Sequence, residues 1–82
     1  MTMSVTDFNS ETRDNIQAHY ITGHFDLETA LMRIQHGGFV DLPRERAAEI
    51  LRQPIAPYRV KVLGGRDVTE EQIAARLAEV HA

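Results

Sequence analysis

The fold is decided by residues 25–53, which read FDLETALMRIQHGGFVDLPRERAAEILRQ. The i, i+3, i+4 and i+7 positions of a helix lie on one face, and apolar residues hold all four here: Leu27, Ala30, Leu31 and Ile34. Asp26 stands before this stripe as a capping carboxylate, and Gly37 follows it as a helix-ending glycine. The sequence therefore predicts an amphipathic helix that starts after Asp26 and ends near His36.

A second helix is expected from about Pro43 to Gln53. Asp41 and Pro43 form a restart signal, because a capping carboxylate and an early proline both favour a helix N-terminus. Its buried face would be formed by Ala47, Ile50 and Leu51. Pro54 and Pro57 should end it, since proline has no amide proton and forces the preceding residue out of the helical region.

Two further helices flank this stretch. Ser10 is a candidate N-cap for a helix from about Glu11 to Thr22, which would bury Ile16, His19 and Tyr20 and turn Gln17 outward. At the other end of the chain, Thr69 and Gln72 match a capping box. They predict a last helix from about Glu70 to Val80, with Ile73, Leu77 and Val80 buried.

The segment YRVKVL, Tyr58 to Leu63, alternates between apolar and basic residues. A period of two is typical of a half-buried strand, so an extended segment is expected here, with Tyr58, Val60 and Val62 inward. Such a strand needs a partner. Ser4 to Phe8, Phe39 to Asp41 or a second copy of the chain would supply one, and otherwise the segment is only an extended connector.

The predicted fold class is therefore mostly α, a small bundle of about four helices with one short extended segment. Residues 1–9 show no convincing period and are expected to form a loosely ordered arm, while residues 10–82 form a single small helical domain. A chain of 82 residues buries only about 60 to 65% of its unfolded surface, so a deep enzyme cleft is hard to build.

Composition narrows the functional classes further. The chain has no cysteine, which excludes disulfides and thiolate chemistry and favours a cytoplasmic setting. The N-terminal residues lack the basic start and apolar run of a signal peptide, and no segment approaches the roughly 20 apolar residues of a membrane-spanning helix.

The four histidines do not form a recognisable metal or catalytic motif. No HExxH pair is present, and the spacings among His19, His24, His36 and His81 are not those of zinc ligands. The glycine pairs at 37–38 and 64–65 lack the spacing of phosphate-binding loops and are interpreted as turns. We therefore expect no cofactor, no metal and no catalytic residue.

Charge is the strongest functional signal. Residues 42–66 carry six of the nine basic side chains and only two acidic ones, although the whole chain has a net charge of −3. One interpretation is a helix-turn-helix regulator whose 43–53 helix reads nucleic acid through Arg44, Arg46 and Gln53. Glu45, Glu49 and the overall acidic balance argue against it, because binding to DNA depends on neutralising phosphates.

The preferred interpretation is a non-enzymatic protein-binding module. Arginine and tyrosine are common at protein interfaces, and a basic face on an acidic protein suits an acidic partner surface. The alternative is that the arginines pair with Glu45 and Glu49 and only solvate the helix. The expected contact residues are Arg44, Arg46, Arg52, Tyr58, Arg59 and Lys61.

Size and charge resemble the short accessory proteins of bacteria and phages, including stoichiometric inhibitors of larger complexes, although no family motif supports that resemblance. An unpaired strand at Tyr58 to Leu63 would also allow a homodimer, because an exposed strand edge can recruit a second copy.

Overall fold

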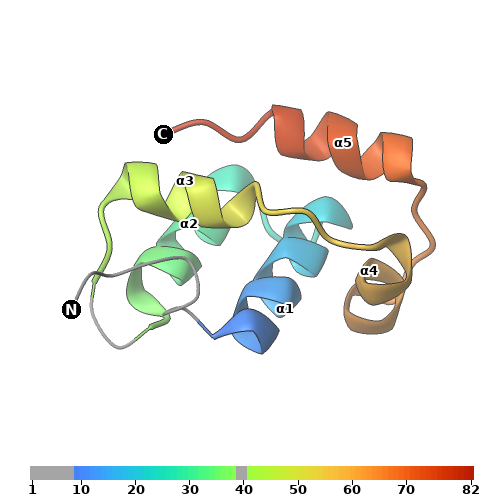
Figure 1. The fold of residues 1–82 in the computed structure, drawn as a ribbon, viewed down its shortest axis with the longest axis horizontal. Helices are drawn as coiled ribbons and strands as arrows, with labels where there is room; N and C mark the ends of the chain where they lie inside the picture. Colours follow the sequence, from blue (N-terminus) through green and yellow to red (C-terminus); the bar gives the residue numbers. More distant parts are fainter. Residues whose placement is uncertain (1–8, 39–40) are drawn as a thin grey trace.

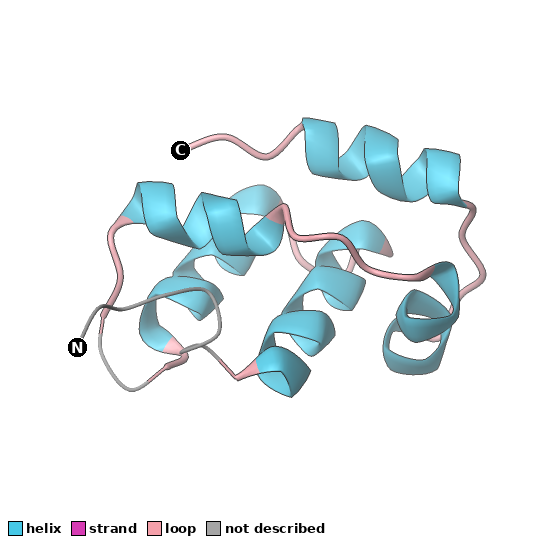
Figure 2. Ribbon diagram, viewed as in Figure 1, coloured by secondary structure: helices cyan, strands magenta, loops and turns pink. Residues whose placement is uncertain are grey.

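The structure is a computed structural model that describes residues 9–38 and 41–82. These residues form five helices, which run in the chain order α1 (Ser10–Ile21), α2 (Leu27–His36), α3 (Arg44–Leu51), α4 (Pro57–Gly64) and α5 (Glu70–Ala78) (Figure 1). No strand occurs in the described ranges (Figure 2). The mostly helical fold is confirmed, and none of the described helices is long and apolar enough to cross a membrane.

Helix α1 lies at the centre of the fold and contacts each of the other four helices. Its buried residues therefore point in several directions around the helix: Ile16, Gln17, Ala18, Tyr20 and Ile21. The expectation that Gln17 faces outward is wrong. Its side chain is fully buried and donates hydrogen bonds to the carbonyl oxygens of Leu51 at 2.9 Å and Gln53 at 2.6 Å.

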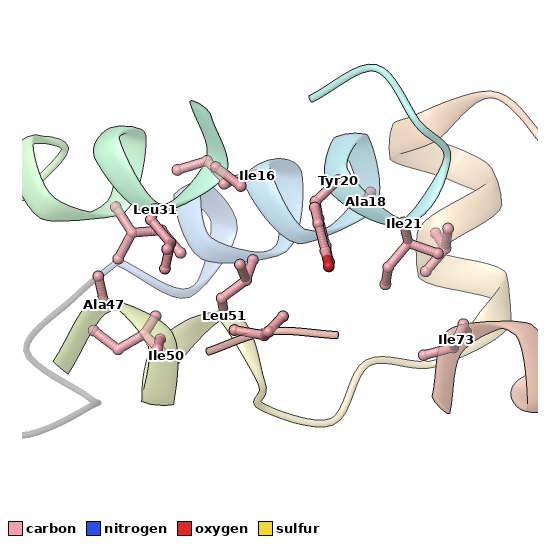
Figure 3. Close-up of a cluster of buried hydrophobic side chains, with 14 residues drawn as sticks. Ile16, Ala18, Tyr20, Ile21, Leu31, Ala47, Ile50, Leu51 and Ile73 are labelled. Atoms are coloured by element: carbon pink, nitrogen blue, oxygen red, sulfur yellow. The ribbon is translucent and has the colours of Figure 1, made fainter. Parts of the chain in front are cut away.

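Helices α2 and α3 form the hairpin that the central stretch predicts. Leu31, Ala47 and Ile50 are fully buried in the shared core (Figure 3). The Asp26 carboxylate caps α2 by accepting a hydrogen bond from the Thr29 amide at 2.8 Å, which lowers the pKa of Asp26.

The bounds of α3 differ from the prediction. The helix begins at Arg44 after Pro43 in the N-cap position and ends at Leu51, two residues before the expected end at Gln53. Pro43 has no side-chain acceptor, so α3 has no side-chain cap. Asp41 is not the cap, because its carboxylate instead contacts the Nδ1 of His36 at 3.1 Å.

The extended segment predicted at Tyr58 to Leu63 is wrong, because these residues lie in α4. Pro57 starts the helix as its first residue, where a fixed φ and a missing amide proton are harmless. Val60 is fully buried, and Gly65 ends the helix with a left-handed φ of 76°. The proposed pairing with another strand or a second copy fails with it, because the backbone groups are hydrogen-bonded within α4.

Gly64 allows α4 to approach α1 closely. A Cβ atom at Gly64 would lie 2.7 Å from the Thr22 Cγ2 atom and 3.1 Å from the Ala18 carbonyl oxygen. A side chain at this position would therefore push the two helices apart. As a helix, the segment makes this close contact with α1. The local alternation of apolar and basic residues gives no sign of it.

The two ends of the fold are largely as predicted. Helix α5 begins with the expected reciprocal hydrogen bonds between Thr69 and Gln72, and ends at Ala78, two residues before the expected end. Helix α1 is capped by Asn9 and not by Ser10, since the Asn9 side chain accepts from the amides of Glu11 and Thr12. The other N-terminal residues, 1–8, lie outside the described residues, and so do the candidate strand at 4–8 and the first two residues of the candidate strand at 39–41.

Candidate functional site

The predicted contact residues lie on α3, directly after α3, and on α4. Arg44 and Arg46 belong to α3, Arg52 follows it directly, and the other three belong to α4: Tyr58, Arg59 and Lys61. The structure describes an intramolecular partner for each of the five basic side chains. The basic segment is therefore not one open positive face, and each residue must be considered with its partner.

Arg44 joins α3 to α2. Its guanidinium forms a two-pronged ion pair with the Glu28 carboxylate, in which the Nη1 to Oε1 distance is 2.9 Å. This hydrogen bonding lowers the pKa of Glu28 and raises that of Arg44. The geometry matches the bidentate pairing that guanidinium and carboxylate groups favour.

Arg46 and Gln53 are also occupied. Arg46 pairs with Glu49 one turn along the same helix, with an Nη1 to Oε2 distance of 2.7 Å. The Gln53 side chain donates to the Glu49 carbonyl oxygen at 3.1 Å. The three residues that a helix-turn-helix would need for base and phosphate contacts are thus turned toward groups of the same chain.

Arg59 joins α4 to α1. Its Nε lies 3.1 Å from Asp14 Oδ2, and its Nη2 lies 3.1 Å from Glu11 Oε1. Hydrogen bonds to Glu11 and then Asp14 raise the pKa of Arg59. Arg52 has a different partner and donates to the carbonyl oxygen of Val80 at 3.3 Å, which holds the C-terminal residues against α3.

Tyr58, Lys61 and Val62 form the outer face of α4, and we call them the α4 face. Tyr58 is 75% exposed and Val62 is 55% exposed, and they stand one helical turn apart on the side opposite Val60. Lys61 pairs with Asp67 at 3.3 Å, but both side chains are well exposed. The sequence prediction missed Val62 because a strand would have turned Val62 inward with Tyr58 and Val60. A helical period would have placed Val62 beside Tyr58.

The histidines mainly form local hydrogen bonds. The Nδ1 atom of His19 lies 2.7 Å from the Asn15 carbonyl oxygen, that of His24 lies 2.7 Å from Thr22 Oγ1, and that of His81 lies 2.9 Å from the Glu79 carbonyl oxygen. Within residues 9–38 and 41–82, no three His, Cys, Asp or Glu side chains converge as metal ligands.

A scan against protein-family models, a search of curated proteins and a search of solved structures each gave no match to this chain.

Proposed function

We propose that the chain is a non-enzymatic protein-binding module that docks its partner on the α4 face. The observation that carries this proposal is the exposure of Tyr58 and Val62 on one side of a short helix, 75% and 55% respectively. An aromatic and an aliphatic side chain one turn apart offer a compact apolar anchor. Tyrosine is favoured at interface centres because its ring buries a large area while its hydroxyl remains hydrogen-bonded.

The charges around the α4 face favour an acidic partner. Lys61 lies between Tyr58 and Val62 in the sequence and forms an ion pair with Asp67. The side chains of Lys61 and Asp67 are 60% and 83% exposed. An exposed pair of this kind contributes little to stability and exchanges partners readily. Lys61 can therefore turn to a carboxylate on the partner, whereas Arg59 stays paired with Asp14 and Glu11 of α1.

The remaining predicted residues contribute less under this proposal. Arg44 and Arg46 would have to leave Glu28 and Glu49 before either could bind another molecule. The same contacts disfavour the helix-turn-helix alternative, in which Arg44, Arg46 and Gln53 reach nucleic acid. We propose a cytoplasmic role as a small inhibitor or accessory subunit of a larger assembly, on the sequence arguments of size and missing cysteine.

The test is a pull-down from a lysate of the source organism, with and without nuclease. The wild-type chain is compared with a Tyr58→Ala, Val62→Ala double variant and with Glu71→Ala as the control. Glu71 is exposed on α5, away from the α4 face, so its truncation tests the loss of a surface side chain elsewhere. We expect a protein that survives nuclease, is retained by Glu71→Ala and is lost from the double variant.

Two other results would contradict the proposal. A protein partner that the double variant retains and an Arg44→Ala, Arg46→Ala variant loses would move the contact to α3. Recovery of nucleic acid alone, abolished by nuclease, would instead support the helix-turn-helix alternative. A second copy of the chain is the third possible occupant of the α4 face. Sedimentation of the purified chain tests for it, since a dimer that Tyr58→Ala dissociates would show that this face binds another copy and not a different protein.

A further inference from the structure

An open groove runs between α1 and α2 and shares no residue with the α4 face. It has a volume of about 800 Å³, and the residues that form its floor and edges include Ile16, His19, Phe25, Met32, Arg33 and His36. Ile16 is 7% exposed at the floor, and Met32 is 54% exposed at the edge. The groove therefore offers an apolar surface that solvent reaches.

The groove has the shape of a site for a helix. On α1 its lining residues fall at i, i+3, i+4 and i+7 from Thr12 to His19, and on α2 they fall at the same spacing from Thr29 to His36. Each helix thus contributes one continuous stripe about two turns long. Ile16 and Met32, one from each stripe, offer apolar contacts to the apolar face of an amphipathic helix.

One end of the groove is built from stacked cationic and aromatic groups. The rings of His19 and Phe25 stack with their centroids 5.2 Å apart, and the Arg33 guanidinium carbon lies 5.0 Å from the centroid of Phe25. This stacking holds Arg33 at the groove edge by a cation–π contact. Its N–H donors can bond an acceptor such as a carboxylate oxygen.

The charged side chain that lines the groove is Arg33, and no carboxylate lines it among the described residues. The exposed Asp41 carboxylate lies beside the groove, 3.1 Å from His36 Nδ1. Unlike Arg44, Arg46 and Arg59, Arg33 forms no ion pair with a described residue. A carboxylate from an incoming molecule is its natural complement.

We infer that the α1–α2 groove is a second docking site, which takes an acidic amphipathic helix of a partner protein. The apolar side of that helix covers Ile16 and Met32, and a Glu or Asp on its edge pairs with Arg33. This inference goes beyond the α4 face and does not depend on it, so the chain would hold two partners or two parts of one.

The test uses two capped model peptides of about 12 residues, roughly three helical turns. Both carry leucine at i, i+3, i+4 and i+7 positions; one has glutamate at the remaining positions and the other has lysine. Each is titrated into the full 15N-labelled chain while the backbone amide shifts are followed. We expect the glutamate peptide to shift amides of α1 and α2 along the groove and the lysine peptide to bind at least about 10-fold more weakly.

Charge reversal sharpens the test. Arg33→Glu should weaken the glutamate peptide about 10-fold and strengthen the lysine peptide, because the attraction changes sign. Arg66→Glu is the matched control, since Arg66 is exposed and lies outside the groove. Arg33 is exposed as well, so circular dichroism of both variants should match the wild type.

Several results would overturn the inference. Equal binding of the two peptides would remove the role of charge, and shifts confined to α4 would place the peptide on the other face. An equal effect of Arg33→Glu and Arg66→Glu would reduce the interaction to net charge. Binding that occurs only after removal of residues 1–8 would assign the groove to the chain itself and not to a partner.

Discussion

The α2–α3 hairpin and the α1–α4 pair are built by different means. In the hairpin each helix is amphipathic, and its buried residues lie on one side of the helix. In the α1–α4 pair, α1 is buried on several sides and α4 buries a single residue completely, Val60. The hairpin depends mainly on patterned apolar residues, whereas the α1–α4 pair depends on the close contact at Gly64 and on the Arg59 ion pairs. The buried Gln17 amide joins α1 to the end of α3.

The difference shows what a hydrophobic pattern can and cannot predict. An apolar period in the sequence indicates a helix that is buried on one side and exposed on the other. A central helix such as α1 is buried on several sides, so its exposed residues do not contrast with a single buried face. A short helix at the end of a fold has few buried residues to reveal a period. The four predictions below test this difference, beginning with the largest expected effect.

The largest effect is expected from Gln17→Leu. The substitution leaves the carbonyl oxygens of Leu51 and Gln53 without the donor that now satisfies them. Urea unfolding should show a loss of about 2–3 kcal/mol in the free energy of unfolding. The matched control in the hairpin is Gln35→Leu, since Gln35 donates to the Leu42 carbonyl at 3.2 Å but is only half-buried. The control should lose less than about 1 kcal/mol, and equal losses would show that burial of Gln17 is unimportant.

Gly64→Val should separate α4 from α1. The new side chain would collide with Thr22 and approach the Ala18 carbonyl oxygen. We expect a loss of about 2 kcal/mol in the free energy of unfolding, measured by urea denaturation. Lys61→Val introduces the same β-branched residue at an exposed position of the same helix and controls for helix propensity. If both variants lose the same stability, the close approach of the helices makes no contribution.

Alanine substitutions at the N-cap of α1 and at the residue after it should have different effects on stability. Asn9→Ala removes the side-chain acceptor for two amides and should cost about 1 kcal/mol, whereas Ser10→Ala should be almost neutral. Hydrogen exchange of the first-turn amides measures the fraying directly. A larger loss of stability from Ser10→Ala would show that Ser10 is the N-cap, as the sequence predicts.

The smallest effects concern pH and should differ between the two regions. The pKa values of Asp26 and Glu28 are lowered, by the amide hydrogen bond of Thr29 and by Arg44 respectively, so their contribution is present above pH ~4 and is lost as the pH falls further. Acid should therefore loosen α2 first. Burial raises the pKa of Tyr20, so its contribution is present below pH ~10 and is lost as the pH rises through the higher folded value.

The alkaline transition should loosen α5, because an ionised Tyr20 can no longer donate to the Arg76 carbonyl oxygen, a bond of 2.9 Å in the folded chain. Amide exchange of α2 and α5 across both pH ranges checks the order. Tyr20→Phe should abolish the alkaline transition of α5 and leave the acid transition of α2 unchanged.

Helices that have a local signal could be predicted from the linear pattern of residues alone. Asp26, Thr69 and Gln72 cap α2 and α5 as predicted, and Ala30, Leu31 and Ile34 of the predicted stripe are buried, with Leu27 partly buried beside them. These features depend on residues within one or two turns of each other, so a linear pattern contains the whole of the information.

The remaining features depend on contacts between residues that are far apart in the sequence. The fate of Gln17 depends on carbonyl groups 34 and 36 residues away, and the approach of Gly64 depends on Thr22 and Ala18. The same holds for the predicted contact residues: Arg44 and Arg59 are paired with carboxylates 16 and 45 residues distant, which no local period reveals. Whether a charged or polar side chain is open to a partner is fixed by what the fold places beside it.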